Sequence, residues 1–362
     1  MYTNYFVSGA ITDNKIFWCT RDKGDFCFFN LKDEHSKYIY LNNEFIMNQE
    51  FSAVVYAKGN IVYGVSEAGK YFWKYIIYEN KLKMYDIECQ GYALDWICNS
   101  CMVGDDLVIV PSRAEVVLWI NTNNGKVFVK NINNKQIKKD HDKRIFINDK
   151  LLLGQLTHDG VIDVFRYNEY CFMKIDLKNR NIIKINYPNE IGKIADVEYY
   201  DGSYYFINED GVLAKWDVVL DKYEIISEYM PGMERITQNN GVLWLLPKYI
   251  DNIKQFDLKT GEIISEYAYP KNVQLDKSVM YDKYMTNNGY IIENKYIKCC
   301  SVYGCNLMFV IDKNRNKGKF YDVFNFESDN LKQYYNKYKS EIYYEKSKSL
   351  KSFLEYNIEI NN

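Results

Sequence analysis

The stretch that decides the fold is Lys254-Gln-Phe-Asp-Leu-Lys-Thr-Gly-Glu-Ile-Ile264. In it, an apolar residue and an aspartate are followed by turn residues and then by β-branched residues, which is the pattern of a β-hairpin. The same order of residue types returns at residues 117–128, 174–183 and 215–225. A hairpin that recurs along one chain predicts a repeat protein built from β-strands.

Tight-turn signals recur along the chain at a nearly fixed spacing. Successive signals lie on average about 46 residues apart, a period typical of propeller blades and solenoids. Asn-Gly and Asp-Gly pairs favour the type I′ turn, which suits a two-residue hairpin. The signals are Asp13-Asn14, Gly59-Asn60, Gly104-Asp105, Asn148-Asp149, Asp201-Gly202, Asn240-Gly241 and Asn288-Gly289.

Short apolar runs follow these turns. Runs of this length that are apolar almost throughout are typical of strands buried on both faces. The spacing of apolar residues is 2 or continuous and not 3.6, which excludes helical solenoids. The runs are 15–19, 61–65, 107–110, 151–153, 204–207 and 242–246, and second loops follow them at 21–24, 67–69, 111–113, 157–160, 208–211 and 247–249.

We therefore predict an all-β fold, a seven-bladed β-propeller of four-stranded antiparallel blades over residues 1–325. Six or eight blades stay open, because the repeat is irregular around residues 166–175 and 289–300. Beyond it, Leu331, Tyr335 and Tyr338 fall at helical spacing, which predicts a short C-terminal helical tail at 326–362. That helix either packs on the propeller or docks a partner. The last stretch, 354–360, alternates like a strand and is a candidate for closing the ring.

Two of the hairpins resemble blades of the quinoprotein-like and WD40-like β-propeller superfamily. The resemblance rests on Phe256-Asp-Leu-Lys-Thr-Gly-Glu262 and Trp119-Ile-Asn-Thr-Asn-Asn-Gly-Lys126, and as a pattern it covers most of the chain. The Gly-His and Trp-Asp signatures of WD40 blades are largely missing, with Trp216-Asp217 the one match. The tryptophan that closes each quinoprotein motif is also missing, which argues against a quinone. The resemblance therefore implies a fold and no particular chemistry.

Composition excludes several function classes. With 46 basic and 48 acidic residues the net charge is −2, which lacks the basic footprint of a nucleic-acid binder. No signal peptide and no apolar run of membrane-spanning length are present, so we expect no membrane partner. Nine cysteines, an odd number, indicate reduced thiols and a cytoplasmic location. Cys98-Asn-Ser-Cys101 has metal-knuckle spacing, but buried packing explains these cysteines better than a metal.

Candidate binding residues fall on one predicted face of the propeller. The loops that lead into the innermost strands share a face with the loops between second and third strands. Charged and aromatic loop residues on a rigid scaffold are the usual chemistry of binding sites. The first loops contain Glu50, Asp95, Trp96, Arg144, Asp196, Arg235 and Lys283, and the second contain Arg113, His158, Asp159, Lys248 and Tyr249.

No catalytic or cofactor motif accompanies this face. The sequence contains no GxSxG elbow and neither of the two glycine-rich phosphate loops, which argues against nucleotide-dependent enzymes and leaves other enzymes open. We expect no cofactor and no metal, and a non-enzymatic role is favoured over an enzymatic one. The interpretation we favour is a monomeric, non-enzymatic scaffold that presents the face to a protein or peptide partner. The alternative is an enzyme or sensor that binds a small polar or glycan ligand in the central channel.

Overall fold

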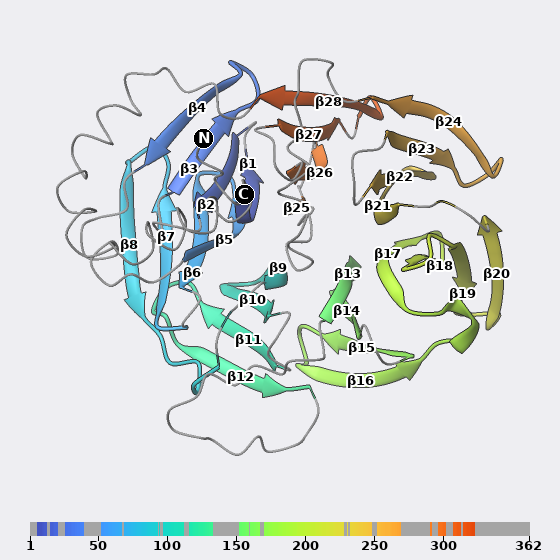
Figure 1. Ribbon diagram of the computed structural model, residues 1–362. Helices are drawn as coiled ribbons and strands as arrows, with labels where there is room; N and C mark the ends of the chain where they lie inside the picture. The colour runs from blue at the N-terminus through green and yellow to red at the C-terminus, as the bar shows by residue number, and fades with distance from the viewer. Residues whose placement is uncertain are drawn as a thin grey trace, which may run out of the picture.

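The computed structural model confirms the all-β propeller prediction. It describes residues 6–12, 15–20, 26–39, 52–66, 69–92, 94, 97–111, 116–132, 152–158, 160–166, 170–227, 230, 232–247, 252–268, 290–291, 296–301, 307–312 and 314–322. Within these residues the strands form seven four-stranded antiparallel sheets, each from four consecutive strands. Figure 1 shows the sheets arranged around a ring in chain order, from blue to red. We number the sheets as blades 1 to 7, from β1–β4 to β25–β28.

Each blade runs from the centre of the ring to its rim. The inner strands are β1 (Phe6–Thr12), β5 (Ser52–Lys58), β9 (Ile97–Val103), β13 (Leu152–His158), β17 (Ile194–Tyr200), β21 (Met233–Asn239) and β25 (Tyr290–Ile291). The second strands are β2 (Lys15–Thr20), β6 (Ile61–Ser66), β10 (Asp106–Pro111), β14 (Val161–Arg166), β18 (Ser203–Asn208), β22 (Val242–Pro247) and β26 (Tyr296–Ser301).

The outer half of each blade is a hairpin of a third and a fourth strand. The third strands are β3 (Phe26–Asn30), β7 (Tyr71–Ile76), β11 (Val116–Asn121), β15 (Cys171–Asp176), β19 (Leu213–Asp217), β23 (Ile253–Asp257) and β27 (Leu307–Asp312). The fourth are β4 (His35–Ile39), β8 (Lys81–Asp86), β12 (Val127–Asn131), β16 (Asn181–Asn186), β20 (Lys222–Ser227), β24 (Glu262–Tyr267) and β28 (Lys317–Asp322). One 3-10 turn, η1 (Asn189–Ile191), leads from blade 4 into blade 5.

The ring closes through its inner strands. Inner strands of successive blades contact one another from β1 to β21, β21 contacts β26, and β25 contacts β1. Blade 1 takes all four strands from one continuous stretch of chain. The described blades therefore leave no position in blade 1 for residues 354–360, and the predicted tail at 326–362 lies outside the described residues.

Burial falls from the second strands to the rim. Every residue of β18 and of β22 is buried, whereas β16 alternates between exposed and half-buried residues. This gradient explains the apolar runs in the sequence, because a strand stacked between two blades has no solvent face. Aromatic side chains fill the space between blades 4 and 5. There the ring centroids of Phe165, Phe172 and Tyr204 lie 4.7–5.5 Å from one another.

Five of the seven predicted tight turns fall in the chain between an inner strand and a second strand, and the first of these, Asp13-Asn14, falls between β1 and β2. The other four, Gly59-Asn60, Gly104-Asp105, Asp201-Gly202 and Asn240-Gly241, each join an inner strand to a second strand, and at least one residue of each pair has a positive φ. The prediction is wrong in blade 7, where Asn288-Gly289 precedes β25.

The prediction is also shifted in blade 4. There the chain turns between β13 and β14, at 159–160, and Asn148-Asp149 precedes β13. Two turn-like pairs compete in this blade, and the sequence pattern favoured the pair nearer the average period.

All seven outer hairpins share one turn geometry. The last turn residue is left-handed in each: Glu34, Asn80, Gly125, Arg180, Asp221, Gly261 and Asn316, with φ between 48° and 74°. An Asx residue at the start of most of these turns accepts backbone N–H bonds from the residues two and three further on, as Asp257 Oδ1 does at 2.7 and 2.9 Å. These bonds explain why the sequence repeats an Asp or Asn at the end of the third strand.

Candidate functional site

The two faces of the ring differ in the connections they carry. One face, here the loop face, carries the connections into the inner strands and those between second and third strands. The opposite face, the turn face, carries the inner hairpin turns and the outer hairpin turns. This assignment follows from the antiparallel order of the strands in every blade.

Asp196 and Arg235 lie near the loop face, at the third position of their inner strands β17 and β21. In both strands the register shifts just before this position, between Ile194 and Asp196 and between Met233 and Arg235. A β-bulge of this kind turns a side chain or a carbonyl out of the regular ladder. Here it turns both side chains toward the joint between blades 5 and 6.

The two side chains connect these blades. Arg235 Nη1 lies 3.7 Å from Asp196 Oδ1 and donates to the Ala195 carbonyl at 3.2 Å. Asp196 Oδ2 accepts the Ile236 N–H at 3.0 Å. The side chains are 14% and 8% exposed for Arg235 and Asp196. Their charges therefore serve a buried contact between blades.

This geometry disfavours a catalytic role for the pair. Arg235 Nε and Thr237 Oγ1 are buried and have no hydrogen-bond partner among the described residues. Because both atoms are closed to solvent, a ligand reaches them only if the blades rearrange. The described part of the inner ring is thus a rigid support for the loops above it.

A similar connection joins blades 2 and 3. The register of β5 shifts between Val54 and Tyr56, and the Val55 carbonyl accepts a hydrogen bond from Ser100 Oγ of β9. In both joints the carbonyl of a bulged residue bonds to a side chain on the inner strand of the next blade. The bulges thus help to hold successive blades together near the loop face.

A buried acid–phenol pair joins blades 4 and 5. Tyr204 of β18 donates its hydroxyl to Asp163 Oδ2 of β14 at 2.7 Å, and Asp163 is fully buried. Burial, followed by the nearby Asp163 carboxylate, raises the pKa of Tyr204 well above its usual range. The phenol therefore remains a hydrogen-bond donor at any physiological pH.

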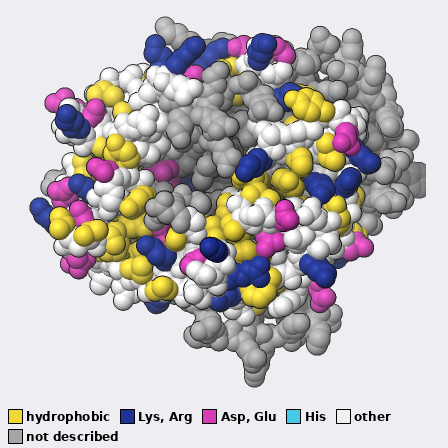
Figure 2. Space-filling model, turned by 180° about the vertical axis from the view of Figure 1, so that it is seen from behind, with side chains coloured by type: hydrophobic (Ala, Val, Ile, Leu, Met, Phe, Trp, Pro, Cys, Tyr) yellow, Lys and Arg dark blue, Asp and Glu magenta, His cyan; other side chains and the backbone are white. Residues whose placement is uncertain are grey.

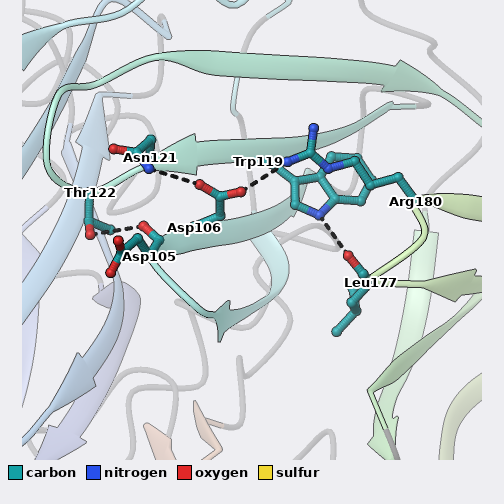
Figure 3. A network of polar contacts seen from close by, with 7 residues as sticks. All are labelled: Asp105, Asp106, Trp119, Asn121, Thr122, Leu177 and Arg180. Carbon is teal, nitrogen blue, oxygen red and sulfur yellow. Dashed lines mark hydrogen bonds and ion pairs between the residues drawn. The ribbon is translucent and has the colours of Figure 1, made fainter.

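Arg180 closes the joint between blades 3 and 4 at the rim (Figure 3). Its Nη2 lies 3.0 Å from Asp106 Oδ2, and its guanidinium lies over Trp119 and Phe128, 5.4 and 4.5 Å from their ring centroids. Trp119 also donates its indole N–H to the Leu177 carbonyl at 3.3 Å. One turn of blade 4 is thus held by several side chains of blade 3.

The equivalent turn residue has different partners elsewhere in the ring. Asn316 of blade 7 accepts from Trp244 of blade 6 at 3.0 Å, and Glu34 of blade 1 pairs with Lys319 of blade 7. Gly261 of blade 6 has no such contact, because a Cβ placed there would have no atom within 4 Å. Neither Arg180 nor Asp163 was among the predicted site residues. In the sequence, Arg180 could have been recognised as a joint residue only by comparing it with the residues at the same turn position in the other repeats.

Only part of the predicted site can be placed. Of its residues, Asp196 and Arg235 are brought together, and the backbone of His158 is described. His158 ends β13, so its backbone lies next to the hairpin to β14, on the turn face. The prediction that places His158 in a loop between a second and a third strand is therefore wrong, because the turn is shifted in blade 4. The rest lie outside the described residues: Glu50, Asp95, Trp96, Arg113, Arg144, Asp159, Lys248, Tyr249 and Lys283.

Metal and redox chemistry find no support in the part of the chain that the structure describes. No group of three or more His, Cys, Asp or Glu side chains there is placed to hold a metal ion. Burial raises the pKa of the Cys89 thiol to about 12, so it stays a protonated, apolar side chain.

Figure 2 shows Lys and Arg side chains interspersed with Asp and Glu on one face of the molecule. Among the described residues, no helix is long and apolar enough to cross a membrane.

Comparisons with known proteins support the fold alone. No protein-family model matches the chain, and no curated protein matches it. Among solved structures, it is similar to KlHsv2 with loop 6CD replaced by a Gly-Ser linker, with a TM-score of 0.50, 9% identity, and 88% of this chain and 92% of that chain covered.

Two further structures have slightly lower TM-scores. BamB from Moraxella catarrhalis has a TM-score of 0.49 and 9% identity over 88% of this chain and 86% of its own. Streptogramin B lyase has a TM-score of 0.48 and 15% identity over 73% of this chain and 79% of its own. At these identities a likeness says nothing about chemistry. The seven four-stranded antiparallel sheets, arranged in chain order around a ring, make this chain a β-propeller.

Proposed function

We propose that the protein is a non-enzymatic scaffold that presents its loop face to a protein or peptide partner. The proposal rests on the role of Asp196 and Arg235, the two loop-face candidates whose side chains are described. Both are engaged in a buried contact between blades. Charged side chains engaged in such a contact hold the blades together and are not available to bind a substrate.

A rigid ring favours binding through the loops that it supports. A scaffold that fixes where its loops begin and end limits the entropy that those loops lose when a partner docks, so less affinity is spent on ordering them. The predicted loop residues Trp96, Arg113 and Tyr249 belong to the residue types that dominate protein–protein hot spots. These three residues are the anchors we propose for the partner.

The test is capture of a partner with matched variants on the two faces. A tagged full chain is incubated with lysate of its source organism, and the bound proteins are identified. The triple variant Trp96→Ala, Arg113→Ala, Tyr249→Ala should lose a specific partner, at least tenfold in yield. Lys58→Ala, an exposed residue at the turn-face end of β5, is the control and should retain it.

A thermal-shift panel tests the alternative, a small polar or glycan ligand in the channel. A ligand that binds only the folded chain raises its melting temperature by mass action. A dose-dependent rise with one sugar or metabolite class, unaffected by the triple variant, would overturn the scaffold proposal. The proposal expects no such rise.

A further inference from the structure

The outer edge of blade 4 has an unusual combination of features. Its rim strand β16 is hydrogen-bonded to β15 and to no other described strand. The β15–β16 ladder is regular over its whole length, as are the outer ladders that end in β4, β8, β12 and β28. The rim strands β20 and β24 each carry a register shift that disrupts the edge. An edge of this kind presents a row of backbone donors and acceptors to an added strand.

Apolar side chains gather beside this edge. Ile183 of β16 is 59% exposed, and Val219 and Leu220, at the tip of the next blade's outer turn, are 86% and 71% exposed. Every other described outer turn has at least one charged or polar residue at these two tip positions. Ile185 and Val218 pack on the same core cluster, which places that turn beside β16 on the side of Ile183.

The two sides of β16 differ in character. Side chains alternate along a strand, so Ile183 and Ile185 share one side and Lys184 lies on the other. The outer hairpin of blade 4 carries Lys174, Lys178, Arg180 and Lys184 against the single acid Asp176, a surplus of basic charge. The corresponding hairpins of blades 5 and 6 carry more acidic than basic residues. An added strand that suits this edge is apolar on one side and acidic on the other.

The chain itself contains such a segment. Leu354-Glu-Tyr-Asn-Ile-Glu-Ile360 places Leu, Tyr and Ile side chains on one side of a strand and Glu355 and Glu359 on the other. We propose that this C-terminal segment, from the same chain, adds to the edge of β16 as a fifth strand. Its apolar side covers Ile183 and the Val219–Leu220 tip, and its glutamates face Lys184.

The connection is long enough. About 30 residues separate Asp322, the end of β28, from Leu354, and an extended chain spans roughly 100 Å over that length. A compact domain of this size has a radius of gyration of about 20 Å, so the segment reaches any blade along the rim.

Hydrogen–deuterium exchange on the full chain tests the proposal. Amides of residues 354–360 should exchange at least tenfold more slowly than in a free peptide of the same sequence. Ile183→Asp should remove this protection. The matched variant Ile225→Asp, on the rim strand of blade 5, where Ile225 is 49% exposed, should not. Protection that survives Ile183→Asp, or none in the parent chain, would overturn the proposal.

A charge exchange separates docking from folding. Lys184→Glu and Glu359→Lys should each speed exchange of the segment severalfold, and the double variant should restore protection. Failure of the double variant to restore it, with the melting temperature unchanged, contradicts the pairing. Protection that appears only as protein concentration rises would assign the segment to a second copy and refute the intramolecular proposal. Neither result depends on the loop face.

Discussion

The joint between blades 3 and 4 and the joint between blades 5 and 6 join the same kind of sheet by different means. The first is tied at the rim, where Arg180 reaches Asp106 and lies over Trp119 and Phe128. The second has a glycine at the same turn position and is tied instead at the inner strands, through Asp196 and Arg235. The blades therefore share one backbone geometry. The polar contact that joins two blades lies at the rim in one joint and at the inner strands in the other.

This difference separates two tasks that a repeat protein has to perform. The turn and strand pattern fixes the shape of each blade, and any blade uses it. The joints fix how blades meet, and each joint is free to use a different chemistry provided that its buried polar groups are satisfied. A contact near the loop face, as in blades 5 and 6, also stiffens the surface that we propose for binding.

The largest expected effect is at the inner joint. Asp196→Ala leaves the mostly buried Arg235 guanidinium without its counter-charge and the Ile236 N–H without its acceptor. Breaking a buried pair in this way costs about 3–5 kcal/mol in the free energy of unfolding. Urea titration of the variant checks this value. Replacing both residues with Met should recover part of the loss, and a loss below about 1 kcal/mol for Asp196→Ala would show that the contact is incidental.

A smaller effect is expected between blades 4 and 5. Tyr204→Phe removes the hydroxyl bonded to Asp163 and leaves a buried acceptor, at a cost of about 1–3 kcal/mol. The folded-state pKa of Tyr204 is raised above its ordinary value of 10.0, so its contribution is complete below pH 10 and is lost as pH rises further. The parent chain should therefore lose more stability than Tyr204→Phe above pH 10. Melting temperatures from pH 8 to 11 measure this, and parallel curves would count against it.

Substitutions of the rim turn residue in each of the two joints test the contrast between them. Arg180→Gly keeps the left-handed turn but removes the cation, and we expect a loss of about 1–2 kcal/mol from the ion pair and the stacking. Gly261→Asn places a side chain in open space at a left-handed position that Asn tolerates, so unfolding free energy should change by less than about 0.5 kcal/mol. Equal effects of the two substitutions would erase the contrast between the joints.

The smallest effect is expected at an outer turn. Backbone N–H bonds from Thr260 and then Lys259 hold the pKa of Asp257 below its ordinary value of 3.8. A lowered folded-state pKa means that its contribution is present above pH 3.8 and is lost as pH falls below it. The parent chain should show a slightly steeper loss of melting temperature between pH 5 and pH 2 than Asp257→Asn. If the melting temperatures of the two chains fall in parallel between pH 5 and pH 2, the ionised Asp257 side chain does not stabilise the turn.

Local chemistry explains how far the sequence alone could predict this structure. The hairpins were predictable because Asp201-Gly202 and Asn240-Gly241 encode their turns over a few residues. Blade 4 was misplaced because Asn148-Asp149 and Asp159-Gly160 both have turn chemistry, and only the pairing of β13 with β14 decides between them.

The joints were not predictable in the same way. Arg180 meets Asp106 across 74 positions of sequence, and Arg235 meets Asp196 across about 40, so neither contact leaves a local pattern. Asp196 and Arg235 were chosen as loop-face residues for their charge and position. What a single sequence does not contain is that each is the partner of the other.

The central claim, that the loop face is the binding surface, is tested most directly by photo-crosslinking. A photoreactive residue replaces Tyr249 of the loop between β22 and β23 in one chain, and Tyr78 of the turn between β7 and β8 in another. Tyr78 is 80% exposed on the turn face and is the matched aromatic control. In lysate of the source organism, the account predicts a discrete crosslinked partner from position 249 and none from position 78. A partner captured from position 78 alone would contradict it.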